Sequence, residues 1–354
     1  MSERLTSSST SKHPRWLQWL PPLFLLVSAV ALFSTTGPSR EIPAELPDSL
    51  FHRLVQLAAQ GLGTERAYWV FLPFALLLIW CSGDLTRRML PPKTPAPART
   101  LATSLGMVCA TMLLLSWLQR GLSPQPASHF GMAATACLLA GWSLYLHGES
   151  AGKRHWCGFA GLMLGLGAGV NAFAAIGVLP VFARATFNLI KNAKDNKIRV
   201  GLLLLGFLLG FLPQLAAFRQ SLPEATAFDF AHTTEALRWL FAAAGVAGVL
   251  FISLALLVGI LQRNALMLGF VLSTLVLQKI ATAFYAEADP ERTGTKLALV
   301  AILYAYGLFR VVRGIESGLH SANPAKVKAL MPALLILLLI IFKIWTARLF
   351  YPAG

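Results

Sequence analysis

Long apolar runs separated by short polar segments recur along almost the whole chain. The clearest runs approach the length of about 20 residues that a helix needs to cross the hydrocarbon core of a bilayer. They begin with residues 17–33 and end with 329–347. The pattern predicts an all-α fold, a polytopic helical membrane protein with about 11 transmembrane helices.

The apolar runs also give approximate helix bounds. One stretch, 156–190, is either one long helix or two short helices that turn near 169–171. We favour the two-helix hairpin, because its glycines suit close packing and a tight reversal. The hairpin also keeps the cations of 191–199 on the same side as Lys153 and Arg154. The predicted helices cover 17–33, 67–83, 101–118, 129–147, the two halves of 156–190, 200–218, 237–261, 265–283, 297–312 and 329–347.

Composition agrees with a membrane protein, since 56% of the residues are hydrophobic and only 13% are charged. The formal charge of +15 could indicate a nucleic-acid partner. However, Lys and Arg concentrate in alternate loops, as expected where basic loops stay in the cytoplasm. We therefore predict no nucleic-acid partner, a cytoplasmic N-terminus and an external C-terminus. Residues 1–15 form a disordered cytoplasmic tail in this interpretation, and 16–354 form a single transmembrane domain.

The segment 34–66 is predicted to be the first outer loop, and it carries both acids and an amphipathic helix. Apolar residues recur at helical spacing over 51–62, which is too short to span a bilayer but can lie along its surface. Glu41, Glu45 and Asp48 precede this helix. Carboxylates beside cations at a membrane face could supply a general base and a clamp for a phosphate leaving group. Alternatively, the acids are solvated and only help to fix topology.

Charged residues inside the predicted spans are few. Lys279 lies near the outer end of its span, where it either snorkels to the interface or binds an anionic head group. Arg184 is interpreted as snorkelling at the inner end of its helix. No predicted span contains a carboxylate at mid-depth, which argues against a proton-coupled transporter. The cysteines show no metal-ligand spacing and are interpreted as small core residues, so we predict no cofactor and no metal.

Four segments of the sequence form a recognisable set: the outer loop with its amphipathic helix, the Gly-rich hairpin, GFLLGFLPQLAAFR (206–219) and DPERTGTKLALVAILYAYGL (289–308). Together they resemble the glycosyltransferase-C superfamily, the polytopic enzymes that use polyprenyl-phosphate sugars. The resemblance implies transfer of a sugar from a polyprenyl-phosphate donor at the outer face of a bacterial-type cytoplasmic (inner) membrane. Glu41 or Asp48 would be the catalytic base. The residues that would bind the donor phosphate are Arg53, Arg219, Lys279 and Arg292.

A function of another class is also compatible with the sequence. The chain could be a non-catalytic integral membrane subunit or scaffold of a larger complex, with membrane proteins as partners. That alternative predicts tolerance of changes at the outer acids and sensitivity at small-residue helix faces. A passive transporter ranks last, because few polar residues occur within the spans.

Overall fold

The structure is a computed structural model, and it describes residues 19–35, 49–119, 126–170, 172–221, 249–264, 266–284, 290–320, 336–341 and 343–344. Within these ranges the secondary structure is helical and contains no strand, which confirms the predicted all-α class. The elements are α1 (Leu20–Thr35), α2 (Leu50–Leu62), the 3-10 helix η2 (Thr64–Phe71), α3 (Leu72–Arg88), α4 (Ala96–Gln119), α5 (Pro126–Ala151), α6 (His155–Val170), α7 (Ala172–Ile176), α8 (Leu179–Lys191), α9 (Ala193–Phe211), the 3-10 turn η4 (Leu212–Gln214), α10 (Leu215–Ser221), a helix over Val249–Leu261, the π-helix η5 (Met267–Leu272), α12 (Ser273–Phe284) and α13 (Pro290–His320).

Six helical stretches in the described part are long and apolar enough to cross a membrane, and four shorter apolar helices accompany them. These ten correspond one by one to the first ten predicted spans. The chain is therefore a multi-pass membrane protein. The predicted span 329–347 falls mostly outside the described residues, so the total of about 11 crossings stays a prediction, as do the sides on which the termini lie. The predicted tail 1–15 also lies outside the described residues.

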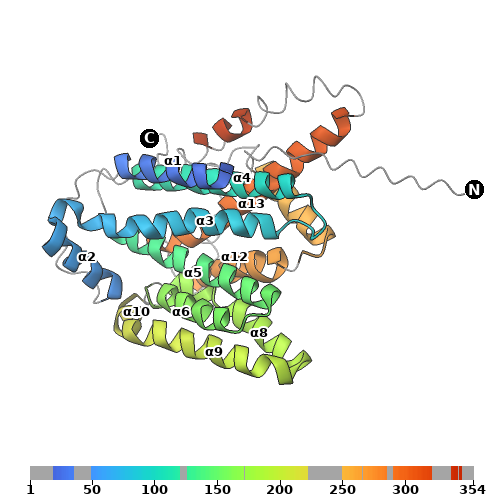
Figure 1. Ribbon diagram of the computed structural model, residues 1–354. Coiled ribbons are helices and arrows are strands. Elements are labelled where there is room, and N and C mark those ends of the chain that lie inside the picture. Colours follow the sequence, from blue (N-terminus) through green and yellow to red (C-terminus); the bar gives the residue numbers. More distant parts are fainter. Residues whose placement is uncertain are drawn as a thin grey trace, which may run out of the picture.

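Burial distinguishes the central helices from the peripheral ones. Of the apolar windows, that of α5 is 83% buried and that of α13 is 72% buried, whereas the stretch Asn196–Arg219, which includes most of α9, is only 28% buried. Trp142 of α5 and Tyr304 of α13 are fully enclosed in the core. In Figure 1, α1, α3 and α4 lie on one side of this centre, and α6, α8 and α9 lie on the other. The exposed leucines of α9 suit contact with lipid.

The predicted hairpin over 156–190 is confirmed. The chain runs out along α6, passes through the short α7 and returns along α8. The indole N–H of Trp142 donates to the carbonyl of Gly177 at 2.8 Å, which fastens the turn between α7 and α8 to α5. At the other end, Arg199 donates to the carbonyl of Gly152 at 3.4 Å. This bond brings the turn between α8 and α9 beside the turn between α5 and α6.

Four glycines let α6 and α9 approach at backbone distance. Gly161 and Gly165 of α6 face the backbone of α9, and Gly206 and Gly210 of α9 face the backbone of α6. A Cβ atom at any of the four positions would collide with a main-chain carbonyl of the other helix. Both pairs have the four-residue spacing of small residues at membrane helix interfaces. Two of the hairpin glycines, Gly161 and Gly165, therefore pack closely against α9, whereas Gly167 faces the backbone of α5.

Two ends of the bundle matter for function. The α2 end contains α2, α7, α10 and the first turns of α5 and α13. The basic end contains the α5–α6 turn and the α8–α9 turn. Figure 1 shows α2 and α10 at the same end of the bundle. The charge distribution predicts that the α2 end faces outward and the basic end faces the cytoplasm.

Candidate functional site

The predicted amphipathic helix is present as α2. Ser49 caps it by accepting a hydrogen bond from the backbone N–H of His52 at 3.1 Å, as a serine at the N-cap should. Phe51 and Val55 are buried, whereas Arg53 and Leu57 are exposed. A helix with this division has one face on the bundle and one free for the membrane surface.

Aromatic contacts hold α2 against the bundle. The ring of Phe51 meets that of Phe74 in α3 edge-on, with centroids 5.1 Å apart. Phe71, at the end of η2, packs edge-on against Phe130 near the start of α5 at 5.4 Å. Such edge-to-face pairs add stability beyond the burial of their area. The α2 end is thus fixed to the central helix α5.

The structure places the predicted site residues on several elements. Glu41 and Asp48, the candidate bases, lie outside the described residues. Arg53 is exposed on α2, Arg219 is exposed on α10, and Lys279 is half-buried on α12. Arg292 belongs to the first turn of α13, but its side chain lies outside what the structure describes. The described cations therefore come from three different helices, and none adjoins another in the chain.

A polar cluster at the α2 end was missed by the sequence reasoning. We call Phe173, Thr274, Gln278, Thr295 and Lys296 the α7 cluster. The ammonium of Lys296 lies over the ring of Phe173, 5.7 Å from its centroid. The side-chain amide of Gln278 donates to the carbonyl of Phe173 at 2.9 Å. α12 and α13 thus both contribute polar groups to the short helix in which the hairpin reverses.

The α7 cluster holds polar atoms in a fully buried setting. Gln278 and Thr274 lie one turn apart on α12, and both are 0% exposed. Within the described part of the chain, Oε1 of Gln278 and Oγ1 of Thr274 have no hydrogen-bond partner. Thr295 shares a hydrogen bond of 3.0 Å with Thr135 of α5. Buried polar atoms without partners are costly, so these two are candidates to bind hydroxyl groups of a ligand.

Only a weak signal in the sequence pointed to this cluster. Gln278 is polar at mid-span, and Lys296 lies one residue before the predicted span 297–312. Hydrophobic periodicity does not indicate that the two helices meet at Phe173. That contact follows from the packing of α12 and α13 around the hairpin.

The basic end contains two ion-paired clusters, around Asp84 and around Arg184, whose surroundings differ from those expected from the sequence. Asp84 was expected in a loop after a helix ending at residue 83. Instead α3 continues to Arg88, and Asp84 is buried at 7% exposure. It pairs with Arg87 and with Arg88 (2.6 Å), and it accepts a hydrogen bond of 2.5 Å from Ser143 of α5. The helix continues because these pairs at spacings of three and four residues satisfy the acid within α3.

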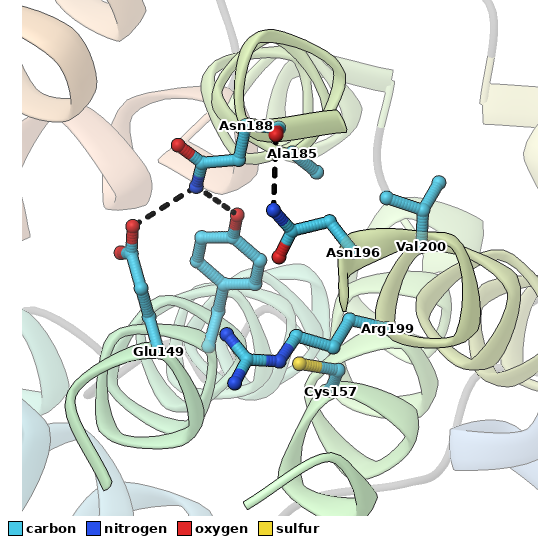
Figure 2. A pocket seen from close by; sticks show the side chains of 8 residues that line it. Glu149, Cys157, Ala185, Asn188, Asn196, Arg199 and Val200 are labelled. Carbon is cyan, nitrogen blue, oxygen red and sulfur yellow. Dashed lines mark hydrogen bonds between the residues drawn. The ribbon is translucent and has the colours of Figure 1, made fainter. Parts of the chain in front are cut away.

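Arg184, which was interpreted as snorkelling at the inner end of its helix, forms an ion pair in the structure. Its guanidinium donates from Nε to Glu149 at 2.9 Å and from Nη2 to the second carboxylate oxygen at 3.1 Å. Asn188 adds a bond of 2.9 Å to the same carboxylate and a longer one of 3.5 Å to the hydroxyl of Tyr145 (Figure 2). A carboxylate partner on α5 is available at this depth, so Arg184 pairs there.

A small recess between α5, α6, α8 and α9 is lined by Tyr145, Glu149 and Asn188, among others. The recess is shallow and partly open, and its enclosed volume of about 10 Å³ has room for little more than a water molecule. Figure 2 shows Arg199 and Cys157 on one side of it, with Glu149 and Asn188 on the other. All four cysteines of the chain are buried and unpaired, in agreement with their interpretation as core residues.

Neither a metal site nor a similar known protein gives further information about the function. Among the residues that the structure describes, no three His, Cys, Asp or Glu side chains gather so that they could hold a metal ion. No family model matches the chain, and neither a curated protein nor a solved structure matches it.

Proposed function

We propose that the protein is a membrane glycosyltransferase that transfers a sugar from a polyprenyl-phosphate donor at the α2 end. In this proposal the α2 end faces outward from a bacterial-type inner membrane. Glu41 or Asp48 deprotonates the acceptor hydroxyl. Arg53, Arg219, Lys279 and Arg292 hold the donor phosphate, and a cation stabilises the leaving group.

The α7 cluster is the observation that carries the proposal. Lys296 and Gln278 both contact Phe173, and the buried hydroxyl of Thr274 lies one helical turn from Gln278 on α12. This cluster is at the end of the bundle that also holds α2 and Arg219 (Figure 1). A phosphate linked to a sugar needs a cation for its charge and hydrogen-bond partners for its hydroxyls. We therefore add Lys296 to the phosphate-binding cations, with Gln278 and Thr274 as contacts for the sugar.

Binding of a short-chain polyprenyl phosphate to the purified protein in nanodiscs tests this site. We expect Lys296→Gln to weaken binding by at least about tenfold, because a charge-assisted hydrogen bond is worth roughly 1.5–3 kcal/mol. Arg219→Gln and Arg292→Gln are tested in parallel. Lys93→Gln is the matched control, since Lys93 is an exposed cation between α3 and α4. Equal binding by wild type and all three variants, or binding no tighter than that of phosphatidylglycerol, would reject the site.

A non-catalytic subunit or scaffold is the second candidate, and one observation favours it. Three acids have side chains that the structure describes, and each pairs with an arginine: Asp84, Glu149 and Glu316. Each of these three carboxylates is therefore occupied by an ion pair and is not a candidate general base.

The purified protein in nanodiscs also separates the two functions, through the variants Glu41→Gln and Asp48→Asn. Loss of sugar transfer in either variant, with insertion intact, supports the enzyme, whereas an absence of transfer in wild type together with no phosphate binding supports the subunit.

A further inference from the structure

The basic end gathers six cations from two turns that are distant in the sequence. Lys153 and Arg154 follow α5, and the bond between Arg199 and Gly152 brings the α8–α9 turn beside them. Five of these side chains are exposed, and Arg199 is half-buried. We call these residues the basic patch: Lys153, Arg154, Lys191, Lys194, Lys197 and Arg199.

The local structure fixes both turns of the basic patch. Gly152 adopts φ +69°, a left-handed conformation that glycine accepts without strain, and this lets the chain reverse after α5. In the other turn, the side chain of Asn196 donates to the carbonyls of Asn188 at 2.9 Å and Asn192 at 3.0 Å. The cations are therefore presented from a defined scaffold.

The basic patch contains more cations than the acids around it can balance. The acid that lines the recess, Glu149, already accepts three hydrogen bonds from the Arg184 guanidinium and one from Asn188. Among the described side chains, no carboxylate forms an ion pair with any cation of the patch. The sequence adds one further acid in these turns, Asp195, against four cations between 191 and 199. The patch keeps a net positive charge.

Arg199 connects the basic patch to the recess. Its side chain lines the recess beside Cys157 (Figure 2). Its Nε is buried and has no hydrogen-bond partner in the described part of the chain, and its bond to Gly152 is long at 3.4 Å. A guanidinium offers five N–H donors in a planar fork that matches two phosphate oxygens. Arg199 thus has donors left for an anion at the mouth of the recess.

Two helix N-termini add to the positive electrostatic potential at the basic end. α6 begins at His155 and α9 begins at Ala193, both beside the basic patch. The first N–H groups of a helix carry partial positive charge and favour an anion. With the cations and Arg199, they make this end attractive to phosphate.

We propose that the basic patch and Arg199 form a binding site for the phosphate head group of an anionic glycerophospholipid. The patch lies where exposed apolar residues of α8 and α9, Phe187, Ile190 and Ile198, offer a surface for acyl chains. An anionic lipid can contact both the cations and the apolar surface, because its phosphate and its acyl chains belong to the same molecule. This site is at the opposite end of the bundle from the α7 cluster and is independent of it.

The ordinary excess of basic residues in cytoplasmic loops makes a different prediction. Cations that only fix topology attract any anionic surface weakly and equally from every loop. A built site instead binds one lipid tightly, and that binding depends on Arg199 more than on other cations at the same end.

Native mass spectrometry of the detergent-solubilised full chain with added lipid tests the proposal. We expect the first phosphatidylglycerol to bind at least about tenfold more tightly than phosphatidylcholine. Arg199→Gln should abolish this preference, whereas Arg199→Lys, which keeps the charge, should retain part of it. Lys153→Gln and Lys194→Gln should each weaken binding by about fivefold, the effect typical of one cation near an anionic surface. Lys93→Gln, which lies outside the patch, should change nothing.

Several outcomes would overturn the site. Equal affinity for the two lipids would do so, and so would a loss in Lys93→Gln as large as that in Arg199→Gln. Competition by inorganic phosphate at millimolar concentration, with no dependence on the acyl chains, would assign the site to a soluble phosphate compound instead of a lipid. Thermal unfolding of each variant without lipid separates loss of binding from loss of the fold. If Arg199→Gln unfolds, Lys153→Gln and Lys194→Gln decide the question.

Discussion

The ion pair between Arg184 and Glu149 joins the hairpin to the centre of the bundle at the scale of single residues. Two guanidinium nitrogens meet the carboxylate, and Asn188 supplies a third donor. The side chains are 32% and 26% exposed, so both charges are partly removed from solvent. If one partner is removed, the other keeps its charge in a partly buried position with no opposite charge to balance it.

Substitution of Arg184→Gln should lower the free energy of unfolding by about 2 kcal/mol, since Glu149 then loses its charged partner. The double variant with Glu149→Gln should recover most of that loss, because no unpaired charge remains. Denaturant unfolding in detergent measures both. Arg313→Gln is the matched control, for Arg313 and Glu316 form an exposed pair on one helix whose loss should cost less than about 0.5 kcal/mol. A double variant as unstable as the single one would show that the unpaired charge is not the cause.

The residue scale is where sequence reasoning was least successful. Arg184 was interpreted as snorkelling, and the predicted span ending at residue 83 left Asp84 in a loop. In the structure each has a partner on α5: Arg184 pairs with Glu149, 35 positions away, and Asp84 accepts from Ser143, 59 positions away. Hydrophobic periodicity reports the face that a residue occupies on its own helix. It does not report which side chain another helix brings to that face, so neither pair was predictable.

At the scale of elements the sequence was more informative. The first ten predicted spans correspond to described helices, and the hairpin was predicted from its glycines and the charge balance. The partner of those glycines was not predicted, although Gly206 and Gly210 repeat the spacing of Gly161 and Gly165. A small-residue motif indicates that a close contact exists, and only the fold identifies the second helix.

Close packing of α6 against α9 can be tested by comparing two glycines of α9. Gly206→Ala should destabilise the protein by about 1–3 kcal/mol, because the new methyl group would meet the carbonyl of Gly158. Gly201→Ala lies on the same helix but faces open space, so it should be neutral or stabilise by up to about 1 kcal/mol. Thermal unfolding in detergent compares them. Equal midpoints would contradict close backbone packing at Gly206.

The whole molecule has two ends with different chemistry. The α2 end combines an amphipathic helix with the α7 cluster, where Lys296 and the buried Gln278 both contact Phe173. The basic end presents exposed cations around a recess. The proposed sugar transfer needs the first end outside, and the positive-inside rule predicts the second end inside. One topology satisfies both requirements.

Labelling of introduced cysteines tests this orientation. Gly61→Cys on α2 and Lys194→Cys in the basic patch both replace exposed residues, while the four native cysteines are buried and serve as an internal background control. In intact spheroplasts, a membrane-impermeant maleimide should label Gly61→Cys at once and label Lys194→Cys only after permeabilisation. The reverse result would place the α7 cluster in the cytoplasm. An enzyme using a donor at the outer face would then be excluded. The lipid site depends only on local charge, so the same lipid-binding experiment would then test it in the opposite leaflet.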